Sequence, residues 1–181
     1  MRYALWEPTG VFWSEPRPST SIGRYFTEML DPAMNWSDVG DMVGDWNGQF
    51  CLKGIMSVGD ATRAAEIGCT GIVLSNHGGR QLDGSRSAFD QLAEIVDAVG
   101  DRLDVMMDGG VQRGTQVLKA LSLGAKAVGL GRFYLFPLAA AGQAGVERAL
   151  GLLRAEIERG MKLMGRASIS QLSRDNLRFR P

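Results

Sequence analysis

The residues with the clearest chemical potential are His77 and Arg80, which lie three positions apart within Ser75–Asp83, SNHGGRQLD. His77 is the only histidine of the chain. An imidazole can accept a proton near neutral pH, and a guanidinium can bind a carboxylate through two parallel hydrogen bonds. Gly78 and Gly79 between them allow a ligand to approach the imidazole closely. The pair therefore suits a small substrate that carries both a hydroxyl group and a carboxylate.

The placement of His77 favours a catalytic function over the common alternative, a hydrogen-bonded histidine in a loop. The apolar run Gly71–Ser75 leads directly into it. In folds built on parallel strands, residues at the carboxyl end of a strand face the reaction cavity. We therefore interpret His77 as a candidate base and Arg80 as a candidate carboxylate-binding residue.

Lys53 ends a second apolar run, Phe50–Lys53. A lysine that follows Phe-Cys-Leu is poorly placed in a barrel interior unless a negative charge meets it there. The alternative is that its ammonium group reaches solvent beyond the end of the strand. The local pattern leaves both interpretations open.

Two glycine-containing turns follow two further apolar runs. Asp108, Gly109 and Gly110 end one run, and Gly131 with Arg132 ends the other. Glycines allow close backbone approach, helix N-termini favour anions, and a guanidinium adds a charge-assisted donor. Either turn alone is weak evidence, because most Gly-Gly turns bind nothing. Together, on consecutive strands, they match the phosphate site typical of barrels.

The runs that carry these residues are short and almost continuously apolar, as strands buried on both faces of a parallel sheet are. A full (β/α)8 barrel typically needs about 250 residues. Four strands in a chain of 181 residues therefore predict half of such a barrel. The predicted strands are Phe50–Lys53, Gly71–Ser75, Asp104–Asp108 and Ala127–Gly131.

Helices are predicted from their start signals and apolar spacing. A serine followed three residues later by an aspartate, the spacing of a capping box, occurs at Ser57 and at Ser87. Further helices are predicted over about Ser37–Val43 and within Gly145–Gly165. The arginine-rich tail Ser168–Pro181 is predicted to lie on the surface.

A weak internal repeat supports the alternation of strands and helices. The segment Ala64–Ser75 resembles Ala120–Gly131. In each copy a predicted helix ends at a glycine, Gly68 or Gly124, and an apolar strand follows after two residues. Two helix–glycine–strand units indicate βα repetition and hence a parallel sheet.

The composition excludes several classes of protein. Hydrophobic content of 45% and charged content of 22% are typical of one globular domain. Twenty basic residues balance twenty acidic ones, so nothing predicts binding to nucleic acid. The two cysteines fit neither a metal cluster nor a disulfide framework, and their apolar neighbours predict buried thiols. Without a long apolar run or a signal peptide, we expect a cytoplasmic protein.

At these residues the sequence resembles the FMN-dependent 2-hydroxy-acid dehydrogenases and oxidases, a family that includes L-lactate dehydrogenase, glycolate oxidase and mandelate dehydrogenase. Ser75–Asp83 is similar to the family's active-site signature, and the likeness extends from about Ser21 to Leu177. It implies that residues 21–181 form the C-terminal half of a (β/α)8 TIM barrel, with about four βα units and a C-terminal helix. Residues 1–20 are predicted to be an irregular N-terminal segment.

The resemblance implies oxidation of a small L-2-hydroxy acid, with L-lactate as the best guess, to the 2-oxo acid, with FMN as cofactor. His77 would act as the base and contact the substrate, and Arg80 would bind the substrate carboxylate. Lys53 would stabilise negative charge on the reduced flavin. The other cofactor-binding residues that the resemblance implies are Ser75, Asp108, Gly109, Gly110, Gln112, Arg113, Gly131 and Arg132.

This sequence departs from the family's pattern at the phosphate end. Gln112 stands where the family usually has an arginine, and Gln116 stands in place of a usual aspartate. Arg113 is the nearest substitute, but its side chain is expected to point elsewhere on the turn. Phe133 replaces a usual proline or alanine. These departures suggest looser FMN binding.

The family has four earlier βα units that this sequence lacks. The alternative function is therefore a truncated, inactive half-barrel that at most binds flavin or needs a complementary half. We expect little or no 2-hydroxy-acid oxidation by the chain alone, a homo-oligomer or a complementary barrel half as partner, and peripheral association with the inner face of a membrane. A sugar-phosphate aldolase or isomerase is the third possibility, which the His77 and Arg80 pair disfavours.

Overall fold

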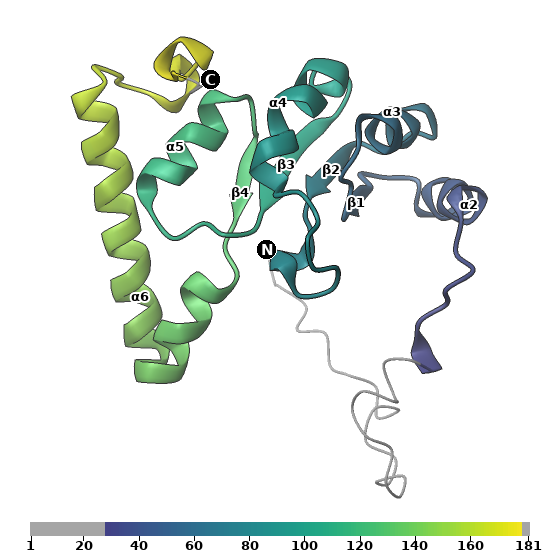
Figure 1. Cartoon of the computed structure of the whole chain (residues 1–181), viewed down its shortest axis with the longest axis horizontal. Helices are drawn as coiled ribbons and strands as arrows, with labels where there is room; N and C mark the ends of the chain where they lie inside the picture. Colours follow the sequence, from purple (N-terminus) through teal and green to yellow (C-terminus); the bar gives the residue numbers. More distant parts are fainter. Residues whose placement is uncertain (1–27, 179–181) are drawn as a thin grey trace, which may run out of the picture. The chain divides into compact units, whose positions relative to one another are not determined.

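The computed structural model describes residues 28–178, and the compact unit Val39–Pro181 is built on a sheet of four parallel strands (Figure 1). The strands pair in the order β1-β2-β3-β4, so each one neighbours the next in the sequence. Parallel neighbours need a crossover connection, and a helix supplies each of them. The predicted parallel sheet is confirmed, with strands β1 Cys51–Lys53, β2 Gly71–Leu74, β3 Asp104–Asp108 and β4 Ala127–Gly129.

The helices begin at the predicted signals. The hydroxyl oxygen of Ser57 accepts a hydrogen bond from the backbone N–H of Asp60 at 3.1 Å, and Ser87 accepts one from Asp90 at the same distance. Each bond satisfies one of the N–H groups that a helix leaves unpaired in its first turn. The helices are α2 Trp36–Trp46, α3 Val58–Glu66, α4 Ala88–Val99, α5 Gly114–Ser122 and α6 Arg132–Leu163.

Both copies of the internal repeat end in the same backbone motif. Gly68 has φ of 92° and Gly124 has φ of 105°, a left-handed conformation that suits a residue without a Cβ atom. The residue after each glycine donates its N–H to the carbonyl five positions earlier, at 3.0 and 3.1 Å. These bonds close α3 and α5 and direct the chain into β2 and β4.

The core lies between the sheet and the helices on its outer side, where α3, α4 and α5 follow one another (Figure 1). Side chains of β2 and β3 on this face are fully buried, and α4 packs against β3. Complete burial of such a side chain contributes about 1.5–3 kcal/mol. The largest of these buried side chains are Ile72, Leu74, Leu92, Ile95, Val99, Val105 and Met107.

The opposite face of the sheet is the one that a complete barrel encloses. Among the described residues, Val73 and Met106 on this face are only partly covered, and Cys51 is exposed. Cys69, on the helix side, is 5% exposed. The prediction of buried thiols is therefore right for Cys69 and wrong for Cys51, because nothing in residues 28–178 covers β1 on the inner face.

The helix α6 contains a break at Ala141 and Gly142, where φ is −151° and 58°. Its second part, which carries the buried Leu153, packs against α5 and matches the helix predicted within Gly145–Gly165. No helix in residues 28–178 is long and apolar enough to cross a membrane.

The chain after α6 forms two single 3-10 turns, Ile169–Gln171 and Arg174–Asn176. The guanidinium of Arg174 binds the Asp97 carboxylate on α4, with N–O distances of 2.6 and 3.0 Å. The predicted surface position of this tail is confirmed up to residue 178. The irregular segment predicted for residues 1–20 lies outside the described residues.

Candidate active site

A cleft of about 280 Å³ opens at the carboxyl ends of the strands. Lys53, Asp108 and Gly129, the last residues of β1, β3 and β4, all line it, and so does His77 after β2. The position is the one expected for the site of a parallel βα fold. The other lining residues are Gly78, Arg80, Gly109, Gly110, Val111, Gln112, Leu130, Gly131, Arg132 and Phe133.

Lys53 meets a negative charge across the sheet. Its Nζ atom lies 2.9 Å from the Asp108 carboxylate and donates a hydrogen bond to the Ser75 hydroxyl oxygen at 2.8 Å. Parallel register brings the three together, because Lys53 pairs with Val73 and the following residues of β2 lie beside the end of β3. A negative charge therefore meets the Lys53 ammonium, as the first of the two interpretations requires. Its side chain is 52% exposed, so the pair adds little to stability and leaves the ammonium accessible from the cleft.

The loop that carries His77 is held by its neighbours. Ser75, which is 5% exposed, accepts a hydrogen bond from the His77 backbone N–H at 3.1 Å. The Asn76 side chain accepts one from Gly79 N–H at 3.2 Å and donates one to the Arg86 carbonyl at 3.3 Å. His77 has φ of 57°, a conformation that costs a non-glycine residue roughly 1–2 kcal/mol. The backbone thus turns sharply after β2 and leaves the imidazole exposed at the cleft.

Arg132 joins this loop to the turn after β4. Its guanidinium donates a hydrogen bond to the Gly78 carbonyl oxygen at 2.9 Å. A Cβ atom on Gly78 would lie 3.0 Å from the same guanidinium, and Gly78 has φ of 68°. A residue with a side chain would be strained there and would press on Arg132.

The turn after β3 supplies the other wall of the cleft. Gly109 and Gly110 have φ of 103° and 71°, so the chain adopts successive left-handed conformations that L side chains disfavour. The turn lies beside Gly131 and Arg132 in the cleft lining. Consecutive glycine turns with a guanidinium beside them suit a phosphate or another anion.

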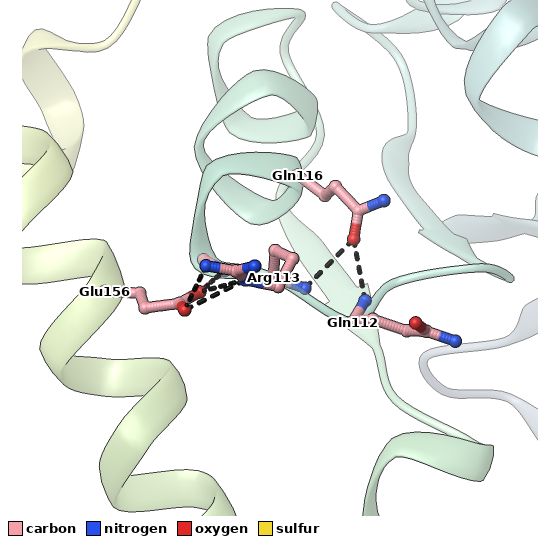
Figure 2. A network of polar contacts seen from close by, with 5 residues as sticks. Gln112, Arg113, Gln116 and Glu156 are labelled. Atoms are coloured by element: carbon pink, nitrogen blue, oxygen red, sulfur yellow. Dashed lines mark hydrogen bonds and ion pairs between the residues drawn. The ribbon is translucent and has the colours of Figure 1, made fainter.

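Arg113, three residues after Gly110, points toward Glu156 on α6 (Figure 2) and is not among the residues that line the cleft. Its Nε and NH2 atoms lie 2.9 and 2.7 Å from the Glu156 carboxylate on α6. The hydrogen bonds from Arg113 and from the Gly114 backbone hold the pKa of Glu156 below its ordinary value, and Glu156 in turn raises the pKa of Arg113. The expectation that Arg113 points elsewhere is confirmed.

All of the predicted site residues line the cleft, except Ser75 and Arg113. Ser75 lies beneath the cleft and binds Lys53, so it remains part of the same cluster. Sequence reasoning missed Asn76, although its place between Ser75 and His77 in the signature segment was a signal. It also did not assign a site role to Phe133, which lines the cleft directly after Arg132.

Comparison with known proteins gives consistent matches. Residues 4–179 match the FMN-dependent dehydrogenase family. The L-lactate dehydrogenase (cytochrome) of Saccharomyces cerevisiae is 45% identical over 164 residues, 88% of this chain and 28% of that enzyme. The pre-mycofactocin synthase of Mycobacterium tuberculosis is 45% identical over 159 residues, 88% of this chain and 40% of the relative.

A solved structure agrees with this assignment of fold. The monotopic membrane protein (S)-mandelate dehydrogenase is 39% identical and superimposes with a TM-score of 0.83, over 87% of this chain and 42% of that one. The chain therefore spans about two fifths or less of the length of the relatives it matches. The four-stranded sheet is a partial TIM barrel of the kind found in these flavoenzymes.

Proposed function

The chain belongs to the FMN-dependent dehydrogenase family, and on that basis we propose that its cleft serves the FMN-dependent oxidation of a small L-2-hydroxy acid to the 2-oxo acid. L-Lactate is the best candidate substrate. The observation that carries the proposal is that His77, Arg80 and Lys53 share one cleft with the two glycine turns. A base, a carboxylate-binding group and an anion-binding wall are the parts that this reaction requires.

The donor set of the cleft fits FMN. Gly109, Gly110 and Gly131 leave the backbone accessible beside the Arg132 guanidinium, which suits the phosphate. Lys53, at the end of β1, holds its ammonium beside Asp108, where it suits the polar edge of the flavin ring. When bound, FMN supplies the acceptor for the hydride equivalent that leaves the substrate.

His77 and Arg80 divide the remaining work between them. Oxidation of a 2-hydroxy acid releases one proton for each hydride equivalent, and an imidazole nitrogen of His77 takes that proton. Arg80 binds the substrate carboxylate, because a guanidinium offers two parallel N–H donors to its oxygens. The carboxylate contact orients the hydroxyl-bearing carbon toward His77 and lowers the entropic cost of reaction.

A second candidate function follows from the sheet. In a closed barrel β1 and β4 each pair on both sides, whereas among residues 28–178 each pairs on one side only. The inner face of β1 to β3 is also partly uncovered in this part of the chain. The second candidate is therefore a flavin-binding half that oxidises substrate only with a complementary barrel half or a second copy.

The carboxylate requirement gives a direct test of the proposed site. The chain is loaded with FMN without oxygen, and flavin absorbance is followed after addition of L-lactate or of lactamide, which lacks the carboxylate. We expect at most slow bleaching by L-lactate in the chain alone, still less by lactamide, and loss of that preference in Arg80→Gln. Equal bleaching by both compounds would contradict the assignment of Arg80, and absence of FMN binding would contradict the proposed function.

A further inference from the structure

The turn between Gly110 and α5 is fixed by the side chain of Gln116. Its amide oxygen accepts hydrogen bonds from the backbone N–H groups of Gln112 at 2.7 Å and Arg113 at 3.0 Å (Figure 2). Both donors belong to the first residues after the glycine turn that lines the cleft. The neutral side chain of Gln116 therefore fixes the backbone at residues 112 and 113, just after the glycine turn.

Glu156 fixes the same segment from the other side. Its carboxylate binds the Arg113 guanidinium and accepts a hydrogen bond from Gly114 N–H at 2.8 Å. A Cβ atom on Gly114 would lie 2.6 Å from the Glu156 Cβ atom and 2.7 Å from the Ile157 nitrogen, so α5 and α6 approach each other closely at a residue without a side chain. The bonds to Glu156 hold the Arg113 side chain against α6.

The two restraints have a consequence for Gln112. The side chains of Gln112 and Arg113 point in opposite directions, and Gln112 lines the cleft (Figure 2). The N–H groups of Gln112, Arg113 and Gly114 are all paired within the chain. The N-terminus of α5 therefore presents none of these three donors to a ligand, and the Arg113 charge is matched by Glu156. What this segment offers to the cleft is the neutral amide of Gln112.

We infer that Gln116 is a positioning residue for phosphate binding, which holds the Gln112 backbone so that the Gln112 amide meets the phosphate end of FMN. The inference rests on the proposed function, because it needs FMN in the cleft. It assigns the contacts with the phosphate group to Arg132, to the glycine turns and to the neutral amide of Gln112. Gln116 acts at the phosphate end, since both hydrogen bonds of its amide oxygen go to the segment that follows the glycine turn.

The test compares FMN with riboflavin, which has the same ring and lacks the phosphate. Binding of each to the 181-residue chain is measured by fluorescence titration for the unsubstituted protein and for Gln116→Ala. We expect the dissociation constant for FMN to rise by about tenfold and that for riboflavin to change less than about twofold. Amide hydrogen exchange at residues 112 and 113, measured without ligand, is expected to become faster.

The chain offers a matched control. Gln171 makes the same pair of bonds elsewhere, accepting from Ala167 N–H at 2.7 Å and Ser168 N–H at 3.3 Å, and it does not line the cleft. Gln171→Ala removes a cap of the same kind and is expected to leave both affinities unchanged. Gln112→Ala removes the amide that faces the cleft while retaining the backbone N–H, and is expected to weaken FMN binding alone.

The outcomes separate the two proposals. Equal losses of FMN and riboflavin binding in Gln116→Ala, or no loss of either, would overturn the role of Gln116. If that variant does not fold, unchanged FMN affinity in Gln112→Ala overturns the inference in its place. An unsubstituted chain that binds no FMN overturns both proposals, whereas one that binds FMN without any reaction with 2-hydroxy acids overturns oxidation by the chain alone and supports the second candidate, a flavin-binding half.

Discussion

The guanidinium of Arg132 lies 2.9 Å from the carbonyl oxygen of Gly78, so the turn after β4 is joined directly to the loop that carries His77. The proposed phosphate contact and the proposed base are thereby linked through one hydrogen bond. A cofactor that binds and shifts Arg132 would therefore also affect the position of the His77 loop through this contact. The geometry of Gly78 makes the link testable.

Replacement of Gly78 by alanine is expected to strain the link. The new Cβ atom would lie 3.0 Å from the Arg132 guanidinium, at φ of 68°. We expect a loss of about 1–3 kcal/mol in the free energy of unfolding, measured by urea titration. Gly79→Ala is the matched control, because Gly79 has φ of 71° and nothing lies within 4 Å of its Cβ position. Equal losses in both variants would show that the contact with Arg132 does not affect the free energy of unfolding.

Replacement of Gln112 by arginine is expected to tighten FMN binding. Gln112 lines the cleft as a neutral group, and a charge-assisted hydrogen bond contributes about 1.5–3 kcal/mol. The affinity for FMN should rise roughly tenfold or more, with that for riboflavin unchanged, in fluorescence titrations. An unchanged FMN affinity would count against the interpretation of Gln112 as the weak point of the phosphate site.

Replacement of Lys53 by methionine should give the opposite pattern. The Lys53 ammonium lies between Ser75 and Asp108, at the carboxyl ends of β2 and β3. We expect FMN and riboflavin to lose affinity by similar factors, because the proposed contact is with the ring that both share. A loss confined to FMN would move Lys53 to the phosphate end and contradict the orientation proposed for the cofactor.

The ion pair between Arg113 and Glu156 predicts a pH dependence of stability. The folded-state pKa of Glu156 is lowered, so its stabilising effect is present above the ordinary glutamate pKa and is lost as pH falls through the lowered value. Glu156→Gln should therefore be less stable than the unsubstituted chain at pH 7, and the difference should shrink under acid conditions. Urea unfolding at both pH values measures this, with Glu147→Gln on α6 as control. A difference that does not change with pH would contradict the assignment.

Much of the fold was predictable from local sequence signals. Ser57 and Ser87 marked two helix starts, and the glycines at 68 and 124 marked two helix ends, because caps depend on a few neighbouring residues. The exposure of Cys51 was not predictable in this way. The exposure of Cys51 depends on what covers the inner face of β1. That cover is a property of the whole barrel and cannot be read from the residues next to Cys51.

The site was predictable in composition and only partly in its contacts. Strand-end positions indicated His77 and Lys53, because parallel strands bring their carboxyl ends together. The partner of Lys53 could not be chosen from the sequence, since Asp108 is 55 positions away and meets it only through sheet register. The ion pair between Glu156 and Arg113 could not be predicted either, because it forms only where α5 and α6 pack together.

We propose that His77 acts as the base for 2-hydroxy-acid oxidation in this cleft. The most direct measurement is the rate at which L-lactate bleaches FMN bound to the chain without oxygen, compared between the unsubstituted protein and His77→Gln at equal FMN occupancy. Removal of a general base lowers a rate by roughly 10²- to 10⁴-fold. We expect a loss in that range in His77→Gln with FMN affinity retained. Equal bleaching rates in the two proteins would contradict it.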